Sequence, residues 1–311
     1  MTISVVVGLR GKVALAFAAV YLIWGSTYLA IRFVIETIPP FLMAGTRFLI
    51  AGTILFMLTR LRGASHASPS HWGKAFVIGG FMLLGGHGAV IWTEQWVPSG
   101  LVSLLIATVP LWMAILCWKL EGVKPSGVIA SALVLGFSGI VLLVGGVEAL
   151  GESHVDLVGA VIVISGAFFW AFGSLYSRSA ELPSSSLLAT AMEMIAGGLL
   201  LLLASFVTGE WMRFGLNQVS VRSIVSWVYL ITFGSLIGFT SYIWLLKATT
   251  AARVSTYAYV NPIVAMFLGW ALANEPITPR NVLAAVIILA SVMIITMHQT
   301  QEKSCKSEYG V

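Results

Sequence analysis

The stretch STYAYVNPIVAMFLGWALANE, residues 255–275, contains an apolar run long enough to cross a lipid bilayer. Its first half carries two tyrosines, Tyr257 and Tyr259, and an asparagine, Asn261, directly before Pro262. Hydroxyls, an amide and a helix breaker are costly where they face lipid, and much less so where they face protein or water. We therefore expect this half of the helix to form one wall of a path through the membrane.

The composition of the whole chain has the same character. Of 311 residues, 59% are hydrophobic and only 9% are charged, whereas a soluble domain carries about 25% charged residues. A water-soluble fold could not cover its surface with so few charges, so the sequence predicts an all-α polytopic membrane protein. The only two cysteines, Cys117 in an apolar segment and Cys305 in the polar C-terminal tail, do not suggest a disulfide framework or a metal site.

The sequence contains no phosphate-binding loop, no cluster of metal ligands and no nucleophile beside a plausible base. We therefore expect no catalytic residues, no metal and no cofactor, and we do not expect an enzyme. The basic residues lie mainly in the loops between apolar segments, which argues against nucleic acid as a partner. The expected partners are the lipid bilayer and a small-molecule substrate.

Apolar segments of about 20 residues recur along the chain, a length that matches a hydrocarbon core of about 30 Å. Ten spans are expected, at 12–33, 41–60, 73–92, 98–117, 125–145, 157–177, 186–207, 223–244, 250–271 and 279–298. The first could be mistaken for a secretory signal, but its apolar run is too long for one. Ten spans place both termini on the same side of the membrane.

The distribution of Lys and Arg indicates which side that is. With a cytoplasmic N-terminus, twelve of the 17 Lys and Arg residues face the cytoplasm, four face outward, and Arg47 lies within a span. Cytoplasmic loops carry an excess of Lys and Arg, so we expect a multi-pass protein of the cell (inner) membrane with both termini cytoplasmic. Residues 1–11 would be a cytoplasmic leader, and residues 299–311 a cytoplasmic polar tail that we expect to be disordered.

The two halves of the chain resemble each other. Trp24 and Arg32 match Trp170 and Arg178 at an offset of 146, and Trp92, Pro110 and Trp118 match Trp244, Pro262 and Trp270 at an offset of 152. The sequence thus predicts two five-helix repeats, at 12–145 and 157–298. Because five is odd, the second repeat is inverted in the membrane. Inverted repeats are typical of secondary transporters, whose site lies near the midplane at corresponding interrupted helices; Pro110 and Pro262 mark such a pair.

Several segments together resemble a known family. They are IWGSTY (23–28), PPFLMAGTRF (39–48), VPSG (97–100), ATVPL (107–111), FWAFGSLYSR (169–178) and YAYVNPIVAMFLGW (257–270) followed by Glu275. From about residue 13 to residue 298 the chain resembles the drug/metabolite transporter superfamily in its EamA branch, and several segments are similar to YedA-type exporters. The resemblance implies ten helices, alternating access, and export of amino acids, other small metabolites or drug-like compounds. Uptake is the alternative direction, and a membrane-embedded enzyme or a scaffold is the alternative class.

The first candidate site residues lie at the proline-containing helix. Tyr257 and Asn261 are four residues apart and share a helix face, whereas Tyr259 points elsewhere and ranks lower. These groups either satisfy backbone groups freed by Pro262, which lacks an N–H, or hydrogen-bond a substrate in a cavity. Pro110 marks the corresponding helix of the first half.

Two mid-span tryptophans, Trp24 and Trp170, have small neighbours at related positions. They either fill tight helix packing or line an aromatic cavity. His87, in GGHGAV, is either satisfied by a neighbouring carbonyl or lines the cavity, where it could take up a proton or bond the substrate.

Arg47 and Glu193 occupy matching positions of the second and seventh spans. They either reach their nearer interface or make separate hydrogen bonds to carbonyls, or one or both bind a charged substrate or relay protons. A direct ion pair between them stays open, as do protons as the coupling ion and a monomeric or homodimeric state. Near span ends we expect Glu94 to be solvated, and Glu275 to be a helix-end or gate residue.

Overall fold

The structure is a computed structural model that describes residues 11–64, 67–122, 126–144 and 156–308. Every regular element in these ranges is helical, and they contain no β-strand. Most elements are α-helices; η1, η2 and η5 are π-helical, and η4 (Leu216–Gln218) is one 3-10 turn. Residues 1–10 and 145–155, where we expected most of the leader and the connection between the repeats, lie outside these ranges.

The elements follow one another along the chain in two groups. In the first half they are η1 (Ala19–Ile23), α2 (Trp24–Val34), α3 (Pro40–Leu61), α4 (Pro69–Gly79), η2 (Gly80–His87), α5 (Gly88–Thr93), α6 (Ser99–Ile106), α7 (Val109–Glu121) and α8 (Gly127–Val144). In the second half they are α9 (Leu157–Ser179), α10 (Ser186–Val207), α11 (Glu210–Arg213), η4, α12 (Val221–Tyr229), η5 (Leu230–Phe239), α13 (Thr240–Ala248), α14 (Ala251–Val254), α15 (Tyr257–Ala273) and α16 (Pro279–Glu308).

Several of these elements join into long apolar helices. In the described residues seven are long and apolar enough to span a membrane, at Gly11–Val34, Pro40–Leu61, Pro69–Thr93, Ser99–Leu120, Leu157–Ser179, Ser186–Val207 and Val221–Ala248. Shorter apolar helices lie at Gly127–Leu143, Val260–Ala273 and Pro279–Ile295 and overlap three further expected spans. The chain is a multi-pass membrane protein.

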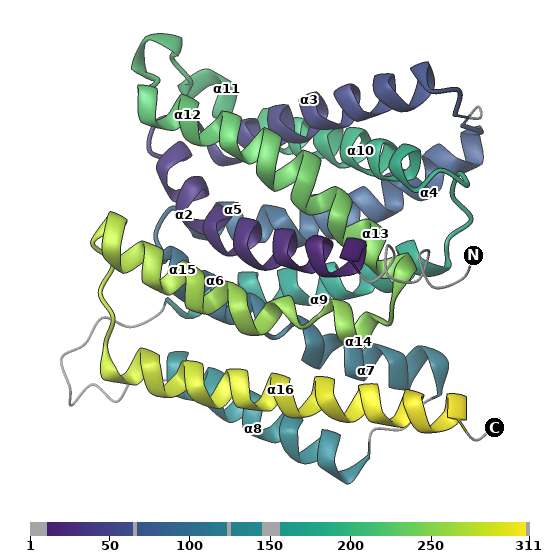
Figure 1. The fold of residues 1–311 in the computed structure, drawn as a ribbon. Helices are drawn as coiled ribbons and strands as arrows, with labels where there is room; N and C mark the ends of the chain where they lie inside the picture. Colours follow the sequence, from purple (N-terminus) through teal and green to yellow (C-terminus); the bar gives the residue numbers. More distant parts are fainter. Residues whose placement is uncertain (1–10, 65–66, 123–125, 145–155, 309–311) are drawn as a thin grey trace.

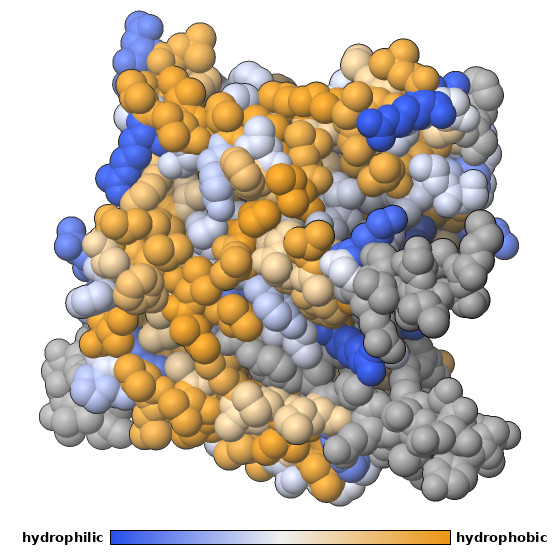
Figure 2. Space-filling model, in the orientation of Figure 1, coloured by the Kyte–Doolittle hydropathy of each residue, from blue (hydrophilic) through white to orange (hydrophobic). Residues whose placement is uncertain are grey.

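The helices run side by side in one bundle (Figure 1). The first described helix begins, and α16 ends, at the same edge of the bundle. In the same orientation, hydrophobic residues cover the middle of the face and hydrophilic residues gather toward the two edges where helices end (Figure 2). This pattern fits a hydrocarbon layer across the middle of the helices.

Glycines permit the closest contacts between the halves. α3 packs against α10, and α8 against α16 (Figure 1). A Cβ added to Gly198 of α10 would lie only 2.8 Å from the backbone nitrogen of Leu49 in α3, and one added to Gly79 would lie 2.6 Å from the backbone nitrogen of Gly197. Such small residues let helix backbones approach in a membrane, where dispersion contacts drive association.

Two further contacts across the halves are related by the sequence repeat. Trp24 of α2 lies against Gly238 of η5, since a Cβ there would be 2.5 Å from Trp24 Nε1. Trp170 of α9 lies against Gly86 of η2, where a Cβ would be 3.1 Å from Trp170 Cβ. The offset of 146 relates the two tryptophans, and the offset of 152 relates the two glycines.

The fourth and ninth apolar segments are both interrupted, but only one break lies at its proline. α6 and α7 are separated at Ala107–Thr108, and Pro110 lies in the first turn of α7, where a missing N–H is tolerated. Pro262, by contrast, lies inside the continuous helix α15. The break falls before Tyr257, where the Thr256 hydroxyl donates to the Arg253 carbonyl at 2.6 Å. The expected interruption at Pro262 is therefore misplaced by about one and a half helical turns.

The C-terminal tail also differs from expectation. α16 continues to Glu308, so residues 299–308 are helical rather than disordered. This segment contains no proline or glycine and includes Gln, Glu and Lys, which are good helix formers that can extend a helix already started in the membrane.

Two helices that begin after a proline are capped by distant carboxylates. The N-cap residues of α3 and α6 are Pro39 and Pro98, whose side chains have no acceptor. Glu210 instead accepts from the backbone N–H groups of Phe41 and Leu42, at 3.2 and 2.8 Å. Glu275 accepts from those of Ser99 and Gly100, at 2.8 and 3.1 Å. Each carboxylate satisfies N–H groups that a helix start leaves unpaired.

Candidate functional site

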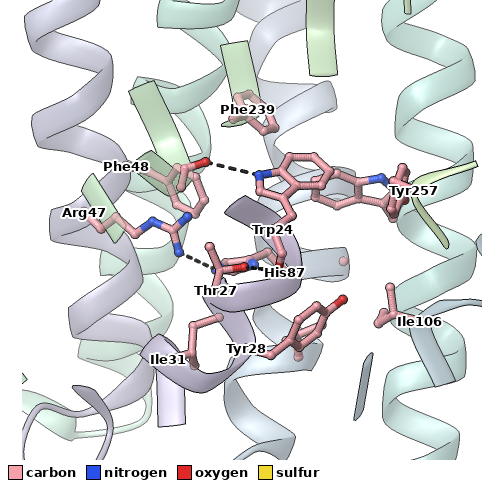
Figure 3. A pocket seen from close by; sticks show the side chains of 14 residues that line it. Trp24, Thr27, Tyr28, Ile31, Arg47, Phe48, His87, Ile106, Phe239 and Tyr257 are labelled. Carbon is pink, nitrogen blue, oxygen red and sulfur yellow. Dashed lines mark hydrogen bonds between the residues drawn. The ribbon is translucent and has the colours of Figure 1, made fainter. Parts of the chain in front are cut away.

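A cavity of about 60 Å³ lies inside the bundle, between elements of both halves (Figure 3). Aromatic and aliphatic side chains dominate its wall, together with one arginine and one histidine. The lining residues are Trp24, Thr27, Tyr28, Ile31, Arg47, Phe48, Gly86, His87, Val90, Ile106, Trp170, Gly234, Phe239 and Tyr257. Four of the residues singled out from the sequence for this role, Trp24, Trp170, His87 and Tyr257, thus line one space, and Arg47 joins them.

Three aromatic rings of the wall, those of Trp24, Trp170 and Tyr257, form a cluster with the ring of Tyr242, which does not line the cavity. Trp24 and Trp170 meet edge to face, with ring centroids 5.5 Å apart. The Trp24 ring also contacts Tyr257 at 5.5 Å and Tyr242 at 4.9 Å. Such contacts stabilise aromatic pairs beyond the area they bury.

The polar atoms of these rings have partners inside the protein. Trp24 Nε1 donates to the Gly234 carbonyl at 3.2 Å (Figure 3), and Trp170 Nε1 donates to the Tyr242 hydroxyl at 3.0 Å. The Tyr242 hydroxyl is also 2.8 Å from the Ser174 hydroxyl. These bonds hold the indole rings in place, because a buried N–H without a partner is costly.

Arg47 and His87 form the polar part of the wall. Arg47 Nε donates to the Ser235 hydroxyl at 2.8 Å, and Nη1 lies 3.3 Å from His87 Nε2 (Figure 3). A guanidinium only donates hydrogen bonds, so His87 Nε2 is the acceptor and carries no proton in this arrangement. The guanidinium carbon also lies 4.7 Å from the centroid of the Phe48 ring.

Arg47 and Glu193 are both buried but have separate partners. The Glu193 carboxylate accepts from the Ser177 hydroxyl at 2.9 Å, and its other oxygen has no hydrogen-bond partner in the structure. In the described ranges the ion pairs are Lys74–Glu181 and Arg222–Glu36, and no Arg47–Glu193 pair occurs among them. The two groups thus make separate hydrogen bonds, but to hydroxyl and imidazole groups rather than to the carbonyls considered from the sequence.

The remaining candidates lie near the cavity without lining it. Asn261 is buried one turn beyond Tyr257, and its Oδ1 has no hydrogen-bond partner in the structure. Pro110 and Pro262 belong to the two interrupted segments but are not among the lining residues. The side chain of Tyr259 lies outside the described part of the chain.

Two π-helical segments contribute residues to the wall. η2 ends at His87 and η5 ends at Phe239, and both residues line the cavity. The two ends are related by the offset of 152. π-helical turns are rare and are frequent at functional sites. They also add residues per turn, which turns the following residues to a new helix face.

A larger, more polar hollow of about 290 Å³ lies at one end of the helices. It is lined by Ile35, Glu36, Thr37, Ile38, Pro39, Pro40, Trp92, Gln95, Thr208, Glu210, Arg213 and Gln218. We call this hollow the vestibule. The Trp92 ring stacks on Phe41 with centroids 5.1 Å apart. Trp92 therefore both packs against Phe41 and lines the vestibule.

Glu94, beside the vestibule residues, differs from its expected solvated state. It is completely buried, and neither carboxyl oxygen has a hydrogen-bond partner in the structure. Its backbone carbonyl accepts from Arg32 Nη1 at 2.8 Å. The expectation was wrong because a residue at a span end can still be covered by neighbouring helices. Glu275 is a helix-end residue, as expected, through its bonds to the start of α6.

Sequence reasoning missed several residues of the site. Ser235 and Tyr242, which hold Arg47 and Trp170, lie in and just after η5. Thr27, Tyr28, Phe48 and Phe239 also line the cavity. One signal was available for Phe239, since it is the repeat partner of His87.

A family model matches both halves of the chain, at residues 11–145 and 157–297, and its description is "EamA-like transporter family". The chain belongs to this family. The resemblance drawn from its motifs is confirmed, and the protein is a membrane transporter.

Individual relatives span the same length. The protein is 37% identical to "Uncharacterized inner membrane transporter YedA" of Escherichia coli K12, over 91% of this chain and 90% of that one. It is 25% identical to "Uncharacterized transporter YoaV" of Bacillus subtilis, over 94% and 99%. It is 22% identical to the "Probable amino-acid metabolite efflux pump" of Escherichia coli K12, over 88% and 91%.

The fold is also known from a solved structure. A crystal structure with 18% sequence identity matches with a TM-score of 0.66, over 94% of this chain and 98% of that chain. At this identity the match shows the shared fold alone.

Proposed function

We propose that this protein is a secondary transporter that exports small metabolites by alternating access, with the cavity at Trp24 and Trp170 as its substrate site. The observation that best supports this is that the cavity lies between elements of both halves and is lined by a buried Arg–His pair and an aromatic cluster. Concave, largely apolar spaces with a few convergent polar groups are typical small-molecule sites. Ionisable groups within spans are functional candidates by default.

The architecture we propose has ten spans in two inverted five-helix repeats, at 12–145 and 157–298. Its support is the repeat of contacts across the halves: Trp24 against Gly238, and Trp170 against Gly86. Further support comes from the two family matches and from the π-helical segments at related positions. In such transporters the repeats move against each other around a central site.

We propose an inner-membrane location with both termini cytoplasmic. The Lys and Arg distribution supports this orientation, as does the common edge at which the described chain begins and ends. In this orientation the vestibule, at the opposite edge near the start of α3, opens outward. It would then be the exit route from the cavity.

In the proposed mechanism, the substrate cavity is too small for a substrate in the conformation described here. The cavity of about 60 Å³ is smaller than the roughly 150 Å³ that holds a benzene molecule in a protein core. A substrate therefore requires side chains or helices to move apart. On the cytoplasmic side, the hydrogen bond between the hydroxyls of Tyr21 and Thr256 joins η1 to the break before α15. We assign this bond to the inner gate.

The role of each residue follows from its place. Trp24, Trp170 and Tyr257 contact the body of the substrate, and Arg47 and His87 contact its polar group. Asn261, Pro110 and Pro262 shape the two interrupted helices beside the cavity. Export is favoured over uptake by the name of one relative, an efflux pump. The sequence holds no nucleotide-binding loop, so an ion gradient, with protons as the candidate ion, or the substrate's own gradient drives transport.

The test is efflux from proteoliposomes loaded with a panel of amino acids and other small metabolites, with and without a pH gradient. At least one compound should leave faster than from protein-free liposomes, and a pH gradient should change that rate if protons are coupled. If no compound leaves faster than from protein-free liposomes and no compound binds the purified protein, the transport proposal fails.

A further inference from the structure

Among the residues that the structure describes, the cation in the cavity has no counter-charge. Arg47 is 2% exposed and extends from α3 toward the cavity (Figure 3). Its hydrogen-bond partners are a serine hydroxyl and an unprotonated histidine nitrogen, both neutral. The two ion pairs found in the described ranges involve other residues, and Glu193, which matches Arg47 in the sequence repeat, bonds to Ser177 instead.

Part of the guanidinium remains available. An arginine side chain carries five N–H donors, and those on Nη2 have no hydrogen-bond partner in the described residues, since the bonds of Arg47 run from Nε and Nη1. Gly234 gives Nη2 room, because a Cβ there would lie 2.7 Å from that atom. Gly234 and Arg47 both line the cavity.

An unpaired buried cation is costly, because the protein interior does not replace its hydration. An anion that enters the cavity would offset the cost of burying the Arg47 guanidinium without a counter-charge. The planar guanidinium can also donate two parallel hydrogen bonds to a carboxylate. A cation entering it would instead face Arg47 with no acid to offset the repulsion, since the lining residues include no Asp or Glu.

The lining residues other than Arg47 and His87 indicate what the uncharged part of the ligand is like. Beyond Arg47 and His87, the cavity is bounded by the faces of Trp24, Trp170 and Tyr257 and by aliphatic side chains such as Ile31 and Ile106. This surface suits a ligand whose uncharged part is apolar or aromatic. It offers few hydrogen-bonding groups to a ligand with many polar substituents.

We propose that this transporter selects small organic anions that carry one carboxylate, bound by Arg47, on an apolar or aromatic body held among Trp24, Trp170 and Tyr257. The inference rests on the proposed substrate site and deepens it by naming the substrate class. His87 positions the guanidinium through the bond to Nη1, and Ser235 does so through the bond to Nε.

The test compares three ligands of one shape and different charge: 3-phenylpropanoate, 3-phenylpropanamide and 3-phenylpropylamine. Binding to the purified wild-type protein is measured by intrinsic tryptophan fluorescence, and flux by proteoliposome efflux. The carboxylate should bind at least about tenfold tighter than the amide, equivalent to ~1.4 kcal/mol, and the ammonium compound should bind weakest. Equal binding of acid and amide, stronger binding of the amine, or no binding of the acid would each overturn the inference.

Two variants assign the preference to Arg47. Arg47→Gln should reduce the acid-to-amide ratio to about one, and Arg47→Lys should keep part of it, because charge remains while the fork geometry is lost. Arg178→Gln, at an exposed arginine of α9 that lines neither the cavity nor the vestibule, is the matched control and should keep the wild-type ratio. An unchanged ratio in a folded Arg47→Gln protein contradicts the assignment. If that variant does not fold, the three-ligand comparison on the wild type still decides.

This experiment separates the anion inference from the transport proposal. If neutral or cationic compounds are exported while the acid is not, transport stands and the anion preference fails. If the acid binds but no compound of any charge crosses the membrane, the anion site stands and the transport proposal fails.

Discussion

The ring of Trp24 meets the ring of Trp170 edge to face, with 5.5 Å between centroids, although 146 positions separate them in the chain. Each indole packs against a glycine of the opposite half, Gly238 for Trp24 and Gly86 for Trp170. The pair therefore lies where the two halves meet, and its surroundings repeat from one half to the other. In the proposed mechanism, movement of the halves changes the space between these rings.

A first prediction concerns Gly238. Replacing it with alanine should push Trp24 out of position, because the new Cβ would lie 2.5 Å from Nε1. Overpacking of this kind costs about 1–3 kcal/mol, and we expect lower thermal stability together with reduced transport. Gly80→Ala is the control, since its Cβ would meet nothing closer than 3.6 Å. Similar effects of both substitutions on melting and efflux would contradict the assigned contact.

A second prediction concerns the cap on α6. Glu275→Ala removes the acceptor of two backbone N–H groups and should destabilise the protein by about 1–2 kcal/mol, measured as a fall in Tm in detergent. The control is Glu181→Gln, at an exposed carboxylate whose pKa is lowered by its bond to Lys74. That substitution should leave Tm nearly unchanged, because exposed ion pairs contribute little. If the two variants melt alike, the carboxylate does not stabilise the helix start.

A third prediction concerns His87. His87→Ala removes the acceptor of Arg47 Nη1 and should lower efflux by about tenfold, as expected for loss of a hydrogen bond to a charged group. His87→Gln offers a carbonyl oxygen that accepts at any pH and should recover part of the rate. Efflux by His87→Ala equal to wild type at every pH would remove this residue from the mechanism.

A fourth prediction concerns orientation. Cys117→Ala leaves Cys305 as the only thiol of the chain. In intact spheroplasts a membrane-impermeant maleimide should not label this variant, whereas permeabilised cells should be labelled. Adding Glu152→Cys places a thiol in the connection expected outside, which should react without permeabilisation. The reverse pattern would show that both termini face outward.

Much of the site was accessible from the sequence, because its most informative residues are rare in apolar spans. Trp24, Trp170, Arg47 and His87 each lie within an apolar segment, and all four line the cavity. The helical class follows from composition, since a bilayer demands that each span satisfy its own backbone groups.

The residues that were missed depend on helix rotation and on neighbours. Ser235 lies inside a π-helical segment and Tyr242 just beyond it, where an assumed period of 3.6 residues assigns the wrong face. The burial of Glu94 and the capping by Glu210 both depend on segments distant in the chain. The break before Tyr257 lies six residues ahead of Pro262 and is accompanied by a local Thr256 bond, which the proline signal does not reveal.

The most direct test of the central claim compares two tryptophans in the efflux assay. Trp24 lines the cavity, whereas Trp270 is 56% exposed on the outside of the bundle. For a compound that the wild type exports, Trp24→Ala should reduce efflux at least about tenfold, equivalent to ~1.4 kcal/mol, and Trp270→Ala should leave it close to wild type. Equal rates for the two folded variants would contradict the assignment of this cavity as the substrate site.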